Sequence, residues 1–179
     1  MTRMVALLRA VNVGKRRLPM AELRAIAETL GFAEAQTHVA SGNLVFAAAG
    51  REPGWAAARL EAAIEARYGW RSEAILRTAA EWTGYAAGSP FSDAERDRPR
   101  LLHLLLSRRP PAPGAAARIA ERAGAGERVA AAGDAIWIDY AGGVARSKLT
   151  PAFIDKCIGS PATARNWNTV LRLDAMVRE

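Results

Sequence analysis

Short apolar runs alternate with amphipathic helical repeats along the first part of the chain. Apolar runs of four to six residues predict strands, and apolar residues three or four positions apart predict helices. In chain order the pattern predicts a strand at 4–9, a helix at 20–30, a hairpin of 37–40 and 44–46, a helix at 55–68 and a strand at 73–77. This β-α-β-β-α-β order is typical of a ferredoxin-like unit, or α/β-plait.

The same order of elements recurs in the second part of the chain. The pattern predicts a strand at 101–106, a helix at 115–123, a hairpin of 128–131 and 136–140, a helix at 151–158, a strand at 162–165 and a last helix at 166–177. We therefore expect an α+β fold with two ferredoxin-like units in tandem and a C-terminal helix. The expected boundaries are residues 1–82 and 100–179, joined by a linker or loop at 83–99, where glycine, proline and mixed charges gather.

Length and composition are those of an ordinary globular protein. The chain has 179 residues, of which 50% are hydrophobic and 24% are charged, so it can bury a core without disulfides. Its single cysteine excludes an internal disulfide and favours a cytoplasmic location. No apolar run approaches the ~18 residues of a membrane span, and the start shows no secretory pattern, so we expect no membrane association.

The net charge of +7 raises the question of a nucleic-acid partner. However, the chain has 22 Arg against 3 Lys and contains 40 Ala, a skew typical of genome-wide codon bias. The positive excess is also spread evenly over the two halves. Neither predicted third strand matches the aromatic pattern of RNA-recognition domains. A nucleic-acid partner is therefore possible but not favoured.

Three polar segments carry side chains that core packing does not require. The first follows the first strand and contains Arg9, Asn12 and Lys15, where a glycine turn leads to a helix start and suits an anion. It lacks the P-loop pattern, and a solvated turn explains it equally. The second is Ser41-Gly42-Asn43, in which Ser41 and Asn43 either form a hairpin turn or orient a small polar ligand.

The third polar segment lies near the C-terminus and is the densest. Its candidate ligand-binding residues are Ser147, Lys148, Arg165, Asn166, Trp167 and Asn168. Asn166 has the position of a helix N-cap. Trp167 can pack in the core, or it can stack on a ring or a guanidinium.

No catalytic or metal-binding constellation is apparent. His38 and His103 lie in predicted strands, where a structural role is the simpler interpretation, and Cys157 suits a buried small hydrophobe. No His, Cys or carboxylate spacing predicts a metal site, and we expect no cofactor. The catalytic residues are unknown, and whether the chain is an enzyme stays open.

The polar segments resemble a bacterial family of uncharacterised proteins, catalogued as domain of unknown function 1697. The resemblance is carried by residues 5–9 with Asn12-Val-Gly14, by 19–23, by 41–46 and by 163–170, the last including Arg-Asn-Trp-Asn-Thr. Family members usually have Gly where this chain has Ala10. The resemblance implies a two-unit ferredoxin-like fold and implies no activity.

These observations lead to one hypothesis with two alternatives. The first is that the polar segments bind a small phosphorylated or otherwise anionic ligand in a cleft between the two units. One alternative is nucleic-acid binding through open sheet faces. The other is a structural or protein-interaction role, in which the polar side chains are buried and hydrogen-bonded. The sequence does not indicate the oligomeric state.

Overall fold

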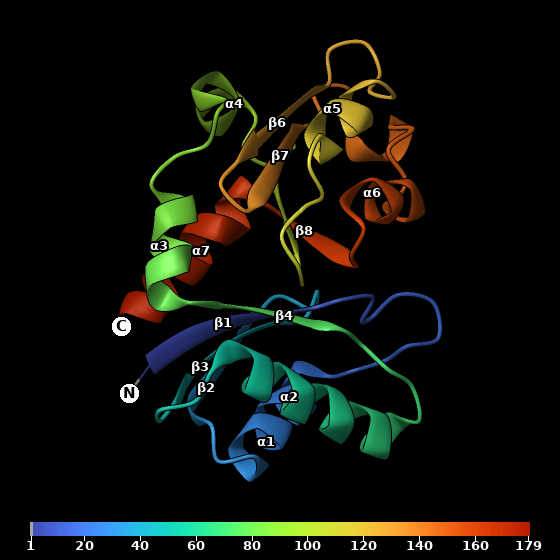
Figure 1. Cartoon of the computed structure of the whole chain (residues 1–179). Coiled ribbons are helices and arrows are strands. Elements are labelled where there is room, and N and C mark those ends of the chain that lie inside the picture. The colour runs from blue at the N-terminus through green and yellow to red at the C-terminus, as the bar shows by residue number, and fades with distance from the viewer. Residues whose placement is uncertain (1) are drawn as a thin grey trace. The chain divides into compact units, whose positions relative to one another are not determined.

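The computed structural model describes residues 2–179, which fall into two compact units. The first unit extends to Thr83 and includes Leu173–Glu179, and the second unit is Gly84–Arg172. Each is a mixed α+β unit with a four-stranded antiparallel sheet, so the predicted α+β class is confirmed. Figure 1 shows the elements along the chain.

The first unit follows the predicted order of elements. Its elements are β1 (Thr2–Leu8), α1 (Met20–Thr29), β2 (Ala33–His38), β3 (Asn43–Ala48), α2 (Pro53–Tyr68) and β4 (Ala74–Thr78). Pro19 precedes α1 and Gly69 ends α2 in the left-handed conformation. The second helix begins at Pro53, two residues before the predicted start at 55. The strand order in the sheet is β2-β3-β1-β4.

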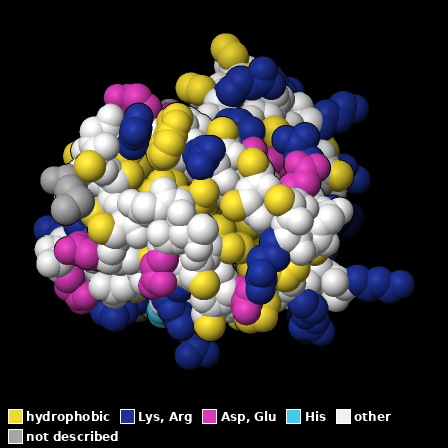
Figure 2. Space-filling model, turned by 90° about the horizontal axis from the view of Figure 1, so that it is seen from below, with side chains coloured by type: hydrophobic (Ala, Val, Ile, Leu, Met, Phe, Trp, Pro, Cys, Tyr) yellow, Lys and Arg dark blue, Asp and Glu magenta, His cyan; other side chains and the backbone are white. Residues whose placement is uncertain are grey.

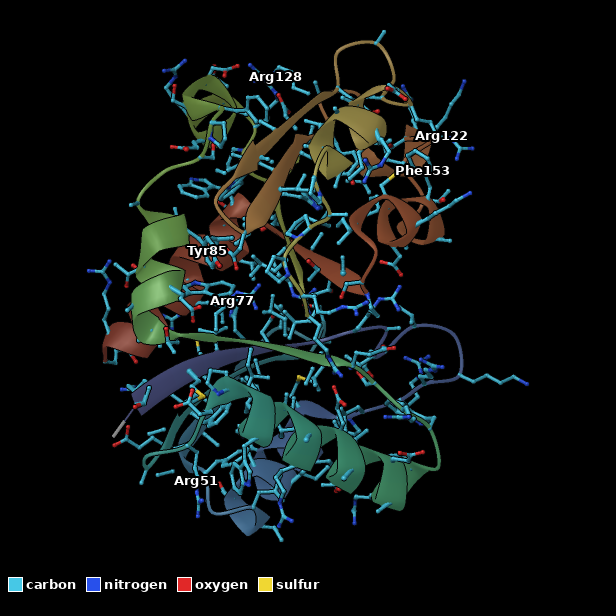
Figure 3. All side chains as sticks on the ribbon, viewed as in Figure 1. Arg51, Arg77, Tyr85, Arg122, Arg128 and Phe153 are labelled. Carbon is cyan, nitrogen blue, oxygen red and sulfur yellow. The ribbon has the colours of Figure 1, made fainter. Side chains whose placement is uncertain are left out.

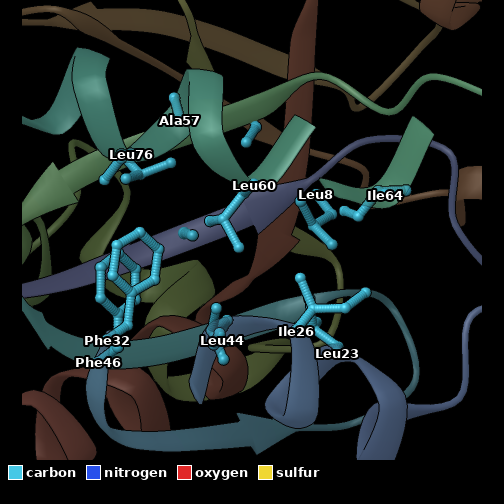
Figure 4. Close-up of a cluster of buried hydrophobic side chains, with 14 of the residues drawn as sticks. Leu8, Leu23, Ile26, Phe32, Leu44, Phe46, Ala57, Leu60, Ile64 and Leu76 are labelled. Carbon is cyan, nitrogen blue, oxygen red and sulfur yellow. The ribbon is translucent and has the colours of Figure 1, made fainter. Parts of the chain in front are cut away.

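The main core of the first unit lies between the sheet and its two helices (Figure 4). Alternate residues of β1, among them Leu8, meet Leu23 and Ile26 of α1 and Leu60 of α2 there. Phe32 and Phe46 stack with ring centroids 4.4 Å apart. The intervening residues Val5 and Leu7 are also buried, which explains why residues 4–8 are apolar without alternation.

The second unit has the same order within its sheet. Its main elements are β5 (Leu102–Ser107), α5 (Ala115–Ala120), β6 (Arg128–Ala132), β7 (Ala135–Asp139), α6 (Pro151–Ile158) and β8 (Ala162–Asn166), with a short 3-10 turn at Val144–Arg146. The strand order is β6-β7-β5-β8. Leu105, Ile119, Ile138 and Ile154 join α5 and α6 to the sheet in one core.

Three further helices complete the chain. They are α3 (Ala79–Ala86), α4 (Ser92–Asp97) and α7 (Trp167–Arg178), and the division between the units falls inside α3 and α7. The stretch 83–99, expected to be a linker or loop, thus contains the end of α3 and the whole of α4. The helix predicted at 115–123 ends earlier, at Ala120, because the chain then turns towards Gly124. No helix within residues 2–179 is long and apolar enough to cross a membrane.

Candidate functional site

The loop between β1 and α1 is held by the side chain of Asn12. Asn12 Nδ2 donates to the carbonyl oxygens of Leu18, at 2.9 Å, and Ala40, at 2.7 Å, and its Oδ1 accepts from the Leu18 amide at 2.9 Å. One amide side chain therefore closes its own loop and joins it to the β2–β3 turn. Because both polar ends of the amide are engaged, Asn12 acts here as a scaffold residue.

Side-chain hydrogen bonds also hold the β2–β3 turn. Asn43 is completely buried, and its Nδ2 donates to the His38 carbonyl at 2.8 Å and to Ser41 Oγ at 3.0 Å. Gly42 packs so closely that a Cβ would lie 2.6 Å from Val11 Cγ2. The structure thus brings Asn12, Ser41 and Asn43 together at one end of the first sheet.

Arg9 and Lys15 belong to the same loop after β1 but have different surroundings. The Arg9 carbonyl accepts from Ser72 Oγ at 2.6 Å, and its guanidinium lies 3.8 Å from the Glu73 carboxylate. Lys15 is exposed at the tip of a tight turn in which the Arg16 amide donates to the Val13 carbonyl. Lys15 is therefore not part of the hydrogen-bonded cluster around Asn12.

The junction of β8 and α7 carries four of the predicted residues. The predicted N-cap is confirmed: Asn166 Oδ1 accepts from the Thr169 amide at 3.0 Å. Arg165 is buried, and its Nη1 donates to Thr163 Oγ1 and to the Ala164 carbonyl, both at 2.8 Å. Burial lowers the pKa of Arg165 to about 10, because the charged form loses its hydration.

The remaining predicted residues of the second unit have diverse environments. Trp167 is buried, and its ring meets that of Trp137 edge-on with centroids 5.6 Å apart. Asn168 and Lys148 are exposed. Ser147 Oγ accepts from the Leu149 amide at 3.1 Å, which shapes the entry to α6. Ser147 and Lys148 thus precede α6, whereas the other four residues follow it at the end of β8.

The carboxylates near α4 form an ion-pair network with two arginines. Asp139 is fully buried, and it is contacted by Arg98 Nη2 at 2.6 Å and by Arg128 Nη2 at 2.7 Å. Asp93 of α4 pairs with the same two arginines, and Arg128 also lies 4.5 Å from the Phe91 ring centroid. The ion pairs connect α4 to β6 and β7. Residues Ser92–Asp97 therefore form an ordered helix rather than a solvated loop.

A groove between α5 and α6 is the candidate binding site that the sequence analysis missed. It has a volume of about 420 Å³ and is lined by Arg118, Glu121, Arg122, Phe153, Lys156 and Cys157. These residues follow i, i+3, i+4 spacing on both helical segments, so each segment presents one face to the groove. The sequence contains both sets of residues, 118/121/122 and 153/156/157, at this helical spacing. Only tertiary packing places the two sets opposite each other.

The charge in this groove is predominantly positive. The Arg122 guanidinium lies 4.6 Å from the centroid of the Phe153 ring, and Figure 3 labels the pair. Arg118 Nη2 donates to the Cys157 carbonyl at 2.8 Å, near the end of α6. Within residues 2–179, neither Arg122 nor Lys156 forms an ion pair with a carboxylate. Two cations that form no ion pair therefore line the groove together with the Phe153 ring and the Glu121 carboxylate.

A second groove lies on the helical side of the first unit. It is lined by Glu22, Ala25, Ile26, Thr29, Leu30, Ala63 and Arg67, between α1 and α2. Hydrophobic side chains reach the surface between charged ones on this face (Figure 2). The Glu22–Arg67 ion pair spans the groove, so its charges already compensate each other. The described residues contain no group of three or more His, Cys, Asp or Glu side chains that could hold a metal ion.

Comparison with known proteins identifies a family and a fold. The family model described as protein of unknown function (DUF1697) matches residues 1–137. Among solved structures, the conserved bacterial protein SP0830 from Streptococcus pneumoniae is similar, with 20% sequence identity and a TM-score of 0.76. That match covers 100% of this chain and 99% of the other, and at this identity it shows the fold alone. No curated protein has a significant match to the chain.

Proposed function

The chain belongs to the family of proteins of unknown function DUF1697, and we propose that it binds a small anionic ligand in the groove between α5 and α6. The observation that carries the proposal is that Arg122, which lies over the Phe153 ring, and Lys156 line one groove and form no ion pair among the described residues, although Glu121 also lines it. A phosphate or carboxylate would take charge-assisted hydrogen bonds from these two side chains. An apolar part of the same ligand would lie against Phe153.

The remaining wall of the groove supports binding rather than chemistry. Arg118 is held in place by the carbonyl oxygens of Pro113 and Cys157, so it is already ordered before a ligand arrives. No histidine lines the groove, and Cys157 is only 6% exposed. A nucleophile with an adjacent base is thus missing from the residues that line it.

The experiment that tests this function is calorimetric titration with pyrophosphate. We expect binding that weakens at least tenfold in the Arg122→Gln/Lys156→Gln variant, because two charge-assisted hydrogen bonds are lost. Arg146→Gln, an exposed arginine of the same unit, is the matched control and leaves the affinity unchanged. Cys157 is the single cysteine, so slower alkylation of its thiol in the presence of pyrophosphate is a second readout. Absence of binding, or an equal loss in Arg146→Gln, refutes the proposal.

For the polar residues of the family motifs we propose a structural role. Asn12, Asn43 and Asn166 each use their side chains in hydrogen bonds within their own unit, which supports this second function. Thermal unfolding tests it: Asn12→Ala lowers the melting temperature by several degrees but leaves pyrophosphate binding unchanged. A variant that keeps its stability yet loses binding contradicts the structural role.

The two units are, we propose, ferredoxin-like units in tandem. The strand orders β2-β3-β1-β4 and β6-β7-β5-β8 support this, because in each the strands of the two β-α-β elements alternate in one antiparallel sheet. In each unit, both helices contribute to one core on one side of the sheet.

A further inference from the structure

Two loops of the first unit lie side by side at the end of its sheet. One is the loop 9–19 after β1, and the other is the connection 69–73 before β4 (Figure 1). Arg16 Nη1 donates to the Arg71 carbonyl at 3.3 Å, and Ser72 Oγ donates to the Arg9 carbonyl at 2.6 Å. These contacts hold the loops together, so residues distant in sequence form one surface.

This surface concentrates positive charge. Lys15, Arg16, Arg17 and Arg71 are all exposed. Only Arg71 has a nearby carboxylate, that of Glu65 at 3.5 Å; among residues 2–179, the other three form no ion pair. The overall charge is spread evenly along the sequence, whereas the folded loops gather four cations in one place.

Two aromatic rings lie beside these cations. The Tyr68 and Trp70 rings have centroids 5.7 Å apart, and the Arg16 guanidinium lies 5.7 Å from the Trp70 centroid. Both rings pack on the core of the first unit while remaining partly exposed. Their positions are therefore set by packing, which lowers the entropic cost of stacking another ring against them.

We propose that this surface, formed by Lys15, Arg16, Arg17, Tyr68, Trp70 and Arg71, binds single-stranded nucleic acid. Cations that track a phosphate backbone, next to aromatic faces on which bases stack, are the combination that sequence-independent single-strand binding requires. Lys15, Arg17 and Arg71 contact phosphates, and a base stacks at Trp70 beside Arg16. This site is separate from the α5–α6 groove and does not depend on it.

Fluorescence anisotropy with a labelled deoxythymidine oligonucleotide of about ten nucleotides tests the proposal. We expect binding at low salt, with a slope of log affinity against log salt of about −2 for three phosphate contacts. Lys15→Gln/Arg17→Gln reduces the magnitude of that slope by about 1.4 and weakens binding on the order of tenfold. Trp70→Leu also weakens binding on the order of tenfold, whereas Trp70→Phe retains most of it, because phenylalanine keeps an aromatic face.

A matched double variant separates this site from a general effect of charge. Arg100→Gln/Arg146→Gln removes the same charge from exposed positions of the second unit, outside the α5–α6 groove, and leaves oligonucleotide binding unchanged. An equal loss in the two double variants overturns the proposal, as does the absence of binding at low salt. Binding to anionic phosphatidylserine vesicles without binding to the oligonucleotide also overturns it, and assigns the surface to a membrane instead.

Discussion

Arg98 donates two parallel hydrogen bonds to the buried carboxylate of Asp139. Nε lies 2.9 Å from Oδ1, and Nη2 lies 2.6 Å from Oδ2. Arg128 contacts the same carboxylate from the neighbouring strand. A bidentate geometry of this kind fixes direction as well as distance, so it determines where the chain after α4 enters the second sheet.

Loss of the Arg98 guanidinium destabilises the second unit. In Arg98→Met the buried Asp139 keeps only Arg128, and we expect the midpoint of urea unfolding to fall clearly, because a buried carboxylate loses one of its two guanidinium partners. Arg96→Met removes an exposed pair with Asp97 and should leave the unfolding midpoint nearly unchanged. Urea denaturation measures both, and similar values would contradict a special role for Arg98.

The same network makes the protein sensitive to acid. Hydrogen bonds from Arg128 and Arg98 lower the pKa of Asp93 to about 2. Because the folded-state pKa lies below the ordinary value of about 3.8, the network stabilises the protein above that pH and this stabilisation is lost as the pH falls towards 2. Denaturation curves between pH 5 and 2 should lose part of their pH dependence in Asp93→Asn. Unchanged pH dependence would show that Asp93 is not held this way.

His103 produces a second pH effect at milder pH. Burial lowers its pKa below the ordinary value of 6.5, since the imidazolium is poorly hydrated there. The unfolded chain then binds a proton more readily, so the free energy of unfolding decreases as the pH falls below about 6.5. Chemical denaturation from pH 8 to 5.5 measures this decrease, and His103→Gln should reduce it. A steeper decrease in the variant would reverse the inferred sign.

Gly42 cannot be replaced without strain. Its φ is +83°, and an added Cβ would lie 2.6 Å from Val11 Cγ2 and 2.8 Å from Leu8 Cβ. We expect Gly42→Ala to cost about 3 kcal/mol, from the left-handed backbone and from overpacking. Gly133→Ala, at φ +59° with open space around it, should cost about 1 kcal/mol. Equal melting temperatures of the two variants would contradict the close packing at Gly42.

Ala10 occupies a backbone conformation that glycine adopts more easily. Its φ is +54°, and its side chain is exposed. Ala10→Gly should stabilise the protein by about 0.5 kcal/mol, because relief of the left-handed conformation exceeds the added entropy of glycine. Ala141→Gly, an exposed loop alanine without a positive φ, should destabilise it by a similar amount. Calorimetric melting of both variants checks the opposite signs.

Local patterns predicted the elements well because each depends on nearby residues. The second helix ends before Gly69 at the predicted residue, and Asn166 caps α7 through the amide three residues later. Hydrophobic periodicity did not predict α4, which lies within residues 83–99. Asp93 of this helix pairs with Arg128, more than thirty residues away. The sequence also did not decide the roles of single polar residues, because turns and ligand-binding sites both favour Asn, Ser and Gly.

The sequence by itself determined the α+β class and the order of the strands and main helices in each unit, because hydrophobic periodicity and backbone preferences act over a few residues. Only the tertiary structure decided which polar side chains form hydrogen bonds within the protein, as Asn12 does with Leu18 and Ala40. It also decided that Arg122 faces Phe153 and that Arg16 lies over Trp70. Such encounters depend on how helices pack and how loops pair, and residues so far apart in the chain leave no local pattern.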